Sequence, residues 1–173
     1  MRKPGARLSR RQGLGMLVRL AGLAGLAGTA GAAQPDTPLP PSRSLPRELD
    51  AALARGEPLV VLASLAGCAW CRLARNNYLA PMRAQDGVAV VQVDFRGQEL
   101  TQAFDGTPIT HDALIRRWQV VVAPTVLFFG PQGREIAPRI EGMSEDFYAA
   151  QLDGRLRRAR QALRDDDGAQ VDP

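Results

Sequence analysis

Residues 59–71 read Leu-Val-Val-Leu-Ala-Ser-Leu-Ala-Gly-Cys-Ala-Trp-Cys, and this stretch decides the fold. The run from Leu59 to Leu65 is continuously apolar and of strand length, which predicts a strand covered on both faces. Ala66 and Gly67 break the run, and a helix is expected from Cys68 to about Ala80. A buried strand that leads into a helix therefore places Cys68 at the junction of the two elements.

The segments on either side alternate between helical and strand patterns. A short helix is expected after Ser44, and Pro81 should kink or end the helix that begins at Cys68. The further expected elements are a strand over 88–95, a loop over 96–109, a helix over 110–118, strands over 125–129 and 134–140, and a helix from Ser144. Alternating segments give parallel strand pairs, and the tight turn at 130–133 adds an antiparallel hairpin. The sequence thus predicts an α/β domain with a central mixed sheet of about four strands flanked by helices.

The chain is expected to divide into four parts. Residues 1–33 have a basic head, a modest apolar stretch and small residues at the end, which is typical of a secretory signal peptide. Residues 34–43 form a Pro-rich linker, and 44–164 form the folded domain. Residues 165–173 form a flexible tail, because the acidic residues at its start are unfavourable at a helix C-terminus.

The signal predicts export to the periplasm. A membrane anchor is the alternative, but Arg19 interrupts the apolar stretch, so no stable membrane insertion is expected once the signal is removed. Ser9-Arg10-Arg11 hints at twin-arginine export, yet Gly13 occupies a position where that motif has a bulky apolar residue. The general secretory route is therefore favoured.

The charge distribution argues against a nucleic-acid partner. The chain carries 22 basic and 18 acidic residues, and six of the basic residues lie within 1–33. Without that segment 16 basic residues face 18 acidic ones, so the basic character belongs to the predicted signal. The remaining domain is expected to be a monomer.

The two cysteines, Cys68 and Cys71, are three positions apart. A disulfide between them closes a very small loop and would stabilise the fold little. A metal site would need further ligands, and His111 is the one histidine in the sequence. Redox chemistry is the favoured interpretation, with Cys68 at a helix N-terminus as the nucleophile and Cys71 as the resolving thiol. This chemistry requires no metal and no cofactor beyond the redox-active disulfide.

From Leu59 to about Leu152 the chain resembles the thioredoxin superfamily. The matching motifs are Cys68-Ala-Trp-Cys71, Ala123-Pro124-Thr125 before an apolar strand, and Gly130-Pro-Gln-Gly133. It is most similar to the periplasmic thioredoxin-like (SoxW-like) and thiol:disulfide interchange proteins, which share Phe104-Asp105-Gly106. The resemblance implies a thioredoxin-like fold and a cis peptide bond before Pro124. It also implies that the Ala123 backbone pairs with an extended substrate segment beside Cys68.

Two departures from the family pattern bear on mechanism. Gly67 replaces the Trp that precedes the first cysteine in cytosolic thioredoxins, and Leu62 occupies the position of a buried acid. The second departure removes the internal general base that the family pattern would supply to Cys71, so water or an Asp or Glu from elsewhere in the chain is expected to take its proton. The Ala-Trp dipeptide also lacks the His common in strongly oxidising relatives, so a reductase of disulfides is favoured, with an upstream thiol protein as its electron donor. A disulfide oxidase or isomerase, and a binding module that holds partners at Pro124 without turnover, are the alternatives.

Other side chains are assigned weaker roles. Trp70 is expected at the rim of the site, either in contact with substrate or packed on the surface. Trp118 should lie in the core, and His111 should be solvated. Arg72 and Arg75 would raise the positive potential near Cys68, although solvated positions on a helix surface are the simpler expectation.

Overall fold

The computed structural model describes residues 37–144 and 146–169. The predicted signal peptide, the first residues of the predicted linker and the end of the predicted tail lie outside the described residues.

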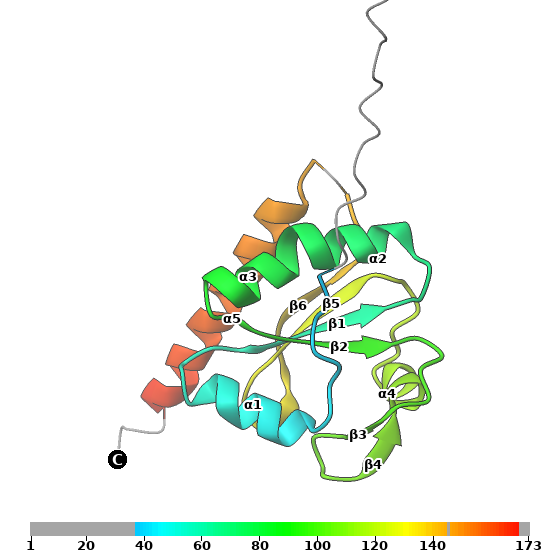
Figure 1. Ribbon diagram of the computed structural model, residues 1–173. Helices are drawn as coiled ribbons and strands as arrows, with labels where there is room; N and C mark the ends of the chain where they lie inside the picture. The colour runs from blue at the N-terminus through cyan, green and yellow to red at the C-terminus, as the bar shows by residue number, and fades with distance from the viewer. Residues whose placement is uncertain (1–36, 145, 170–173) are drawn as a thin grey trace, which may run out of the picture. The chain divides into compact units, whose positions relative to one another are not determined.

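A mixed four-stranded sheet forms the centre of the domain, in the order β2-β1-β5-β6 (Figure 1). β1 (Leu59–Ser64) runs parallel to β2 (Ala89–Asp94) and antiparallel to β5 (Thr125–Phe129). β6 (Glu135–Glu141) pairs antiparallel with β5 and closes the far edge. Every residue of β1 and β5 is buried, as a strand covered on both faces requires. The predicted fold class is confirmed.

Helices cover both faces of this sheet (Figure 1). One face carries the consecutive helices α2 (Ala69–Ala74), η1 (Arg75–Leu79) and α3 (Ala80–Gln85), together with α5 (Tyr148–Ala169). The other face carries α1 (Leu45–Leu53) and α4 (His111–Arg117). Alternate residues of β1 point to the two faces. Val60 and Leu62 belong to the apolar cluster on the face covered by α2 and α5, whereas Val61 and Ala63 belong to the cluster on the face covered by α1 and α4.

The helix that follows the cysteines does not end at Pro81. It passes through the π-helical turn η1 and continues as α3, with Pro81 in the first turn of α3. A proline ring clashes with the carbonyl four residues earlier in a regular α-helix, and the wider π turn just before Pro81 accommodates it.

The segment predicted to be a loop, 96–109, contains most of a second, two-stranded sheet. β3 (Leu100–Gln102) pairs antiparallel with β4 (Pro108–Thr110). Each strand has three residues, which is too short for an alternating pattern to be recognisable in the sequence.

The last helix also differs from its prediction at both ends. α5 begins at Tyr148 rather than Ser144 and continues to Ala169, so residues 165–169 are helical rather than part of a frayed tail. Two contacts support the extra turn. Gln161 Nε2 donates to Asp165 Oδ1 at 2.7 Å, and Arg134 pairs with Asp166 at 3.3 Å.

The described part of the predicted linker packs on the domain. Ser42 N donates to the carbonyl of Gln92 at 2.8 Å, Gln92 N donates to the carbonyl of Pro40 at 2.9 Å, and Leu39 is buried. His111 is fully buried beneath this segment, with Nε2 3.0 Å from the carbonyl oxygen of Ser42. The expectation of a solvated His111 is therefore wrong, because the segment that covers it comes from far away in the sequence.

Candidate redox site

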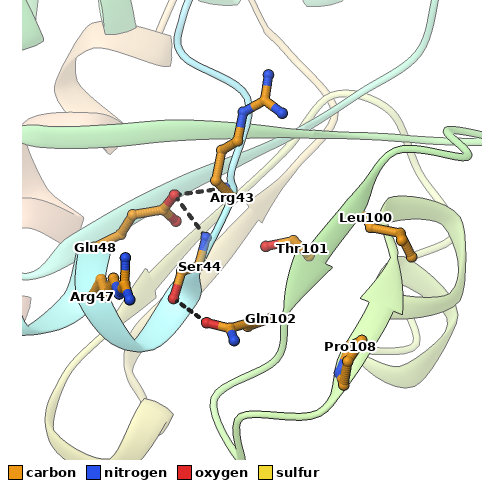
Figure 2. A pocket seen from close by; sticks show the side chains of 8 residues that line it. All are labelled: Arg43, Ser44, Arg47, Glu48, Leu100, Thr101, Gln102 and Pro108. Atoms are coloured by element: carbon orange, nitrogen blue, oxygen red, sulfur yellow. Dashed lines mark hydrogen bonds between the residues drawn. The ribbon is translucent and has the colours of Figure 1, made fainter.

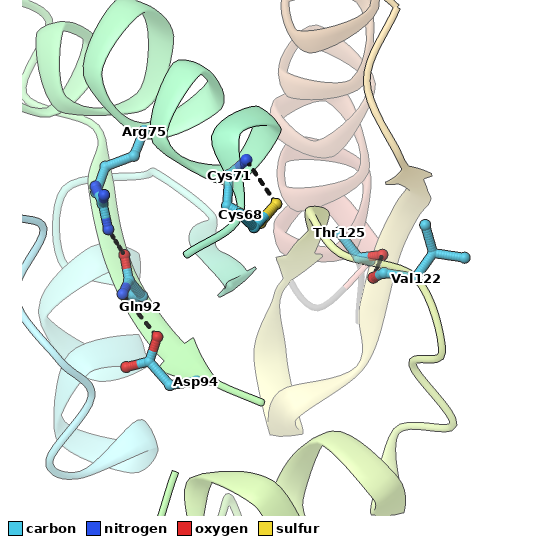
Figure 3. Close-up of a disulfide and its surroundings, with 7 residues drawn as sticks. All are labelled: Cys68, Cys71, Arg75, Gln92, Asp94, Val122 and Thr125. Carbon is cyan, nitrogen blue, oxygen red and sulfur yellow. Dashed lines mark hydrogen bonds between the residues drawn. A yellow bond between two sulfur atoms is a disulfide. The ribbon is translucent and has the colours of Figure 1, made fainter. Parts of the chain in front are cut away.

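Cys68 and Cys71 form a disulfide at the start of α2 (Figure 3). Their Cα atoms are 5.2 Å apart, and Cys68 occupies the N-cap position with extended backbone angles. The Sγ atom of Cys68 accepts a hydrogen bond from the backbone N–H of Cys71 at 3.0 Å. Cys68 is half-buried, whereas Cys71 is 1 % exposed. The two cysteines thus differ in their surroundings, and Cys68 is the more accessible of the two.

A short turn carries the chain from β1 into α2. Cys68 N donates to the carbonyl of Leu65 at 3.2 Å, and Arg72 N donates to the carbonyl of Cys68 at 3.1 Å, the first bond of the helix. Gly67 has φ +76°, a left-handed conformation that side chains other than glycine rarely adopt. No atom lies within 4 Å of a Cβ built at Gly67. The backbone angle, and not lack of space, therefore favours glycine at position 67.

The loop before β5 lies at the same end of the sheet. Ala63 of β1 is opposite Thr125 of β5, so the residues that follow Ala63 and those that precede Thr125 are brought together. The Ala123–Pro124 peptide bond is cis, as the resemblance implied, and Pro124 is buried. Thr125 Oγ1 donates to the carbonyl of Val122 at 2.8 Å and fixes the loop (Figure 3).

An exposed apolar surface accompanies this loop. Val121 is 83 % exposed and Val122 38 %, while Trp70, between the two cysteines, is 49 % exposed. The side chain of Trp70 therefore lies at the surface.

Leu62 lies below this site and is fully buried. It belongs to the same apolar cluster as Val60 and Ala74. At the position where the resemblance implied an acid there is thus a buried aliphatic side chain.

A polar cavity of about 350 Å³ lies beside Cys68. Its lining includes Arg75, which the sequence placed near Cys68, and Gln92 and Asp94, which the sequence analysis missed. Arg75 Nη1 donates to Gln92 Oε1 at 3.3 Å, and Gln92 Nε2 donates to Asp94 Oδ1 at 2.8 Å (Figure 3). Arg72 also lines this cavity. Gln92 and Asp94 interrupt the apolar pattern of β2 two positions apart, which is the signal that could have found them.

A second hollow, of about 490 Å³, separates α1 from β3 and β4 (Figure 2). Several of its polar groups form hydrogen bonds with one another. Glu48 Oε1 accepts from the backbone N–H groups of Arg43 at 2.7 Å and Ser44 at 3.2 Å. Ser44 Oγ donates to Gln102 Oε1 at 2.7 Å, so this hydroxyl attaches the hairpin to α1 instead of capping the helix. These contacts connect α1 to the hairpin of β3 and β4, which is a structural role.

Two side chains with shifted pKa values lie outside the cysteine site. Hydrogen bonds from the hydroxyl and the backbone N–H of Thr107 lower the pKa of Asp105, in the turn between β3 and β4. Burial, and to a smaller extent Tyr78, raises the pKa of Tyr148, which keeps that hydroxyl neutral at the start of α5.

Trp118 is only partly buried and packs against Phe129 and Phe104, with ring centroids 5.0 and 6.3 Å away.

Within 37–144 and 146–169, no group of three or more His, Cys, Asp or Glu side chains is arranged to hold a metal ion. No helix in the same part of the chain is both long and apolar enough to cross a bilayer.

A pair of cysteines at the start of a helix, faced by a cis-proline loop on a β2-β1-β5-β6 sheet, defines the class of thioredoxin-like thiol–disulfide oxidoreductases. The family model described as thioredoxin-like domain matches residues 45–157, and the chain belongs to this family.

The chain is also similar to individual proteins. The chain is 32 % identical over 117 residues to the thiol:disulfide interchange protein DsbD of Cronobacter sakazakii. That match covers 64 % of the chain and 19 % of DsbD, so the chain spans about a fifth of its relative. Among solved structures, it is similar to the DsbH oxidoreductase, at 15 % identity and TM-score 0.48, covering 70 % of this chain and 88 % of that one. A poplar thioredoxin h is similar at 13 % identity and TM-score 0.46, covering 65 % and 94 %.

Proposed function

We propose that the protein is an exported reductase of protein disulfides, in which Cys68 attacks and Cys71 resolves. One observation carries the proposal. The accessible sulfur, Cys68 Sγ, accepts a hydrogen bond from the N–H of Cys71, and the second sulfur is buried one turn further into the helix. A backbone N–H directed at a sulfur stabilises the thiolate, which is the attacking form of cysteine.

The proposed reaction consists of two exchanges. The Cys68 thiolate attacks one sulfur of the substrate disulfide; a mixed disulfide forms, and the other substrate sulfur leaves as a thiolate and takes a proton from water. Cys71 then loses its proton to water and attacks Cys68 Sγ, and the first substrate sulfur leaves and is protonated in turn. Two electrons pass to the substrate, and the product is the Cys68–Cys71 disulfide. A dithiol protein returns two electrons to the pair by the same exchanges in reverse.

The substrate is expected to bind along the loop before β5. The exposed apolar side chains of Trp70, Val121 and Val122 support this role, since they lie at the end of the sheet that carries Cys68. An extended segment of the substrate would pair with the backbone of Ala123 beside the buried Pro124. Protein disulfides are the main proposed substrates. Small-molecule disulfides would contact less of this surface.

Export to the periplasm, with residues 1–33 as a signal peptide, forms part of the proposal. The composition of that segment supports it, because six basic residues precede a modest apolar stretch that ends in Ala-Gly-Ala-Ala. The upstream electron donor would then be another exported dithiol protein, and the domain is proposed to act as a monomer.

The reduction potential tests the direction of electron flow. Equilibration of the purified domain with glutathione buffers should give a value near the thioredoxin end of the scale, about −270 mV. A value near −120 mV would instead favour the oxidase. In a parallel assay, wild-type protein supplied with a dithiol should reduce insulin, and Cys68→Ser should not. If the wild type does not reduce insulin but still binds a partner at the Pro124 loop, the result would contradict the reductase proposal and support the binding-module alternative.

A further inference from the structure

The loop before β5 has unpaired backbone groups at Ala123. Two neighbouring carbonyl groups accept hydrogen bonds, that of Val122 from Thr125 Oγ1 at 2.8 Å and that of Pro124 from Gly142 N at 2.8 Å. Within the part of the chain that the structure describes, neither the N–H nor the C=O of Ala123 has a hydrogen-bond partner. Backbone groups that the fold itself leaves unpaired are available to a second chain.

The side chain of Thr125 supports this loop from the interior of the domain. Thr125 is the first residue of β5, is fully buried, and lies opposite Ala63 of β1. Figure 3 shows its hydroxyl bonded to the carbonyl of Val122, beside the disulfide. A side chain without exposed surface does not touch a substrate, so any effect of Thr125 on the reaction must pass through the backbone that its hydroxyl holds.

The hydrogen bond to Val122 also fixes the direction of the Ala123 N–H. The carbonyl of Val122 and the N–H of Ala123 belong to the same planar peptide group, which is trans. In a trans peptide group the C=O and the N–H point in opposite directions. Because the carbonyl of Val122 points to the buried hydroxyl of Thr125, the N–H of Ala123 points away from the interior.

From this arrangement we infer that Thr125 is a positioning residue for protein substrates, whose hydroxyl holds the Ala123 N–H in the orientation that an extended substrate segment requires. The inference rests on the proposed function and adds to it a residue that does not contact the substrate. Without the hydroxyl, the carbonyl of Val122 loses its donor inside the protein and turns toward water, and the N–H of Ala123 turns with it. A small disulfide contacts less of this loop, so its reduction depends less on Thr125.

Two pairs of proteins that differ in this hydroxyl test the inference: wild type against Thr125→Val, and Thr125→Ser against Thr125→Ala. The second pair repeats the comparison with smaller side chains, in case Thr125→Val does not fold. Each reduced protein is mixed with increasing concentrations of insulin or of bis(2-hydroxyethyl) disulfide, and its oxidation gives a limiting rate and a half-saturating concentration. Thr125→Val should raise the half-saturating concentration of insulin roughly fivefold and change the limiting rate less than about twofold. The rate with the small disulfide should also change less than about twofold.

Rescue by serine and a second buried threonine provide the controls. Thr125→Ser retains the donor and should bind insulin within about twofold of wild type, whereas Thr125→Ala should behave like Thr125→Val. Thr101→Val is the matched control, because Thr101 is also buried and its hydroxyl lies 3.0 Å from that of Ser42, in the two-stranded sheet. This variant loses a buried hydrogen bond of the same kind and should leave the preference for insulin over the small disulfide unchanged. Urea unfolding shows which variants are folded under the assay conditions.

The outcomes separate this inference from the function on which it rests. Equal half-saturating concentrations of insulin for the members of each pair would overturn the inference and leave the reductase proposal standing. The inference would also be overturned if Thr101→Val weakened insulin reduction as much as Thr125→Val, or if both substrates slowed equally. If the wild type does not reduce insulin, the proposed function fails and the inference fails with it.

Discussion

His111 and Ser42 are 69 positions apart in the sequence, yet the imidazole Nε2 of His111 lies 3.0 Å from the carbonyl oxygen of Ser42. The other ring nitrogen, Nδ1, accepts from the backbone N–H of Asp94 at 3.3 Å, which assigns Nε2 as the donor. The Ser42 hydroxyl also bonds Glu48 at 2.7 Å and Thr101 at 3.0 Å. One buried imidazole thus joins the N-terminal segment, the end of β2 and the start of α4.

His111→Ala should lower the free energy of unfolding by roughly 2–4 kcal/mol, because it leaves a cavity and deprives two buried backbone groups of their partner. Urea denaturation measures this change. Arg116→Ala, an exposed substitution on the same helix, is the control and should change stability by about 0.5 kcal/mol or less. A His111→Ala protein as stable as this control would show that the imidazole contributes little to joining these segments.

Gly133→Ala and Gly56→Ala form a matched pair of substitutions. Both glycines are left-handed, with φ of +68° and +67°, so an alanine is strained at either position. A Cβ at Gly133 would overlap the Phe104 ring, whereas nothing lies within 4 Å of one at Gly56. Gly56→Ala should cost about 1–2 kcal/mol of stability, and Gly133→Ala about 1–3 kcal/mol more. Equal losses in thermal or urea unfolding would mean that the Phe104 contact is not limiting.

The parts of the fold that were predictable are those with a strong local pattern. The continuous apolar runs at 59–65 and 125–129 identified the central strands, and Cys68-Ala-Trp-Cys71 identified the helix between β1 and β2. The resemblance added the cis bond before Pro124. For these features the information lies in neighbouring residues.

The remaining features depend on contacts between distant residues. The burial of His111 requires Ser42, and the hollow beside Cys68 requires α2 and β2 to come together. Neither of these long-range contacts produces a periodic pattern in the sequence. The π turn before Pro81 and the extra turn of α5 are local features, but the usual sequence rules predict the opposite. A proline normally ends or kinks a helix, and acidic residues are normally unfavourable at a helix C-terminus.

Alkylation of the reduced protein should distinguish the two thiols. Cys68 is accessible and its sulfur has an N–H donor, whereas Cys71 is 1 % exposed. At pH 7, iodoacetamide should therefore modify Cys68 at least about tenfold faster than Cys71, as followed by peptide mass spectrometry. In urea the two thiols should react at similar rates. Faster reaction of Cys71 in the folded protein would reverse the proposed roles.

The proposed signal peptide predicts a defined mature terminus. Protein recovered from the native cell envelope should begin near Gln34, because small residues occupy 30–33. N-terminal sequencing of the periplasmic fraction provides the measurement, with whole-cell extract as the comparison. Recovery of chains that retain Met1 in the membrane fraction would support an anchor instead.

Trapping of the mixed disulfide tests the central claim most directly. If Cys68 attacks and Cys71 resolves, Cys71→Ser should halt the exchange after the first step, because the second sulfur provides the fast exit from the mixed disulfide. Cys68→Ser should trap far less, since its remaining thiol is buried. On a non-reducing gel, envelope extract from cells that express Cys71→Ser should show substrate adducts that a reductant removes, and Cys68→Ser should show few. Equal trapping by the two variants, or no adducts from either, would contradict the account.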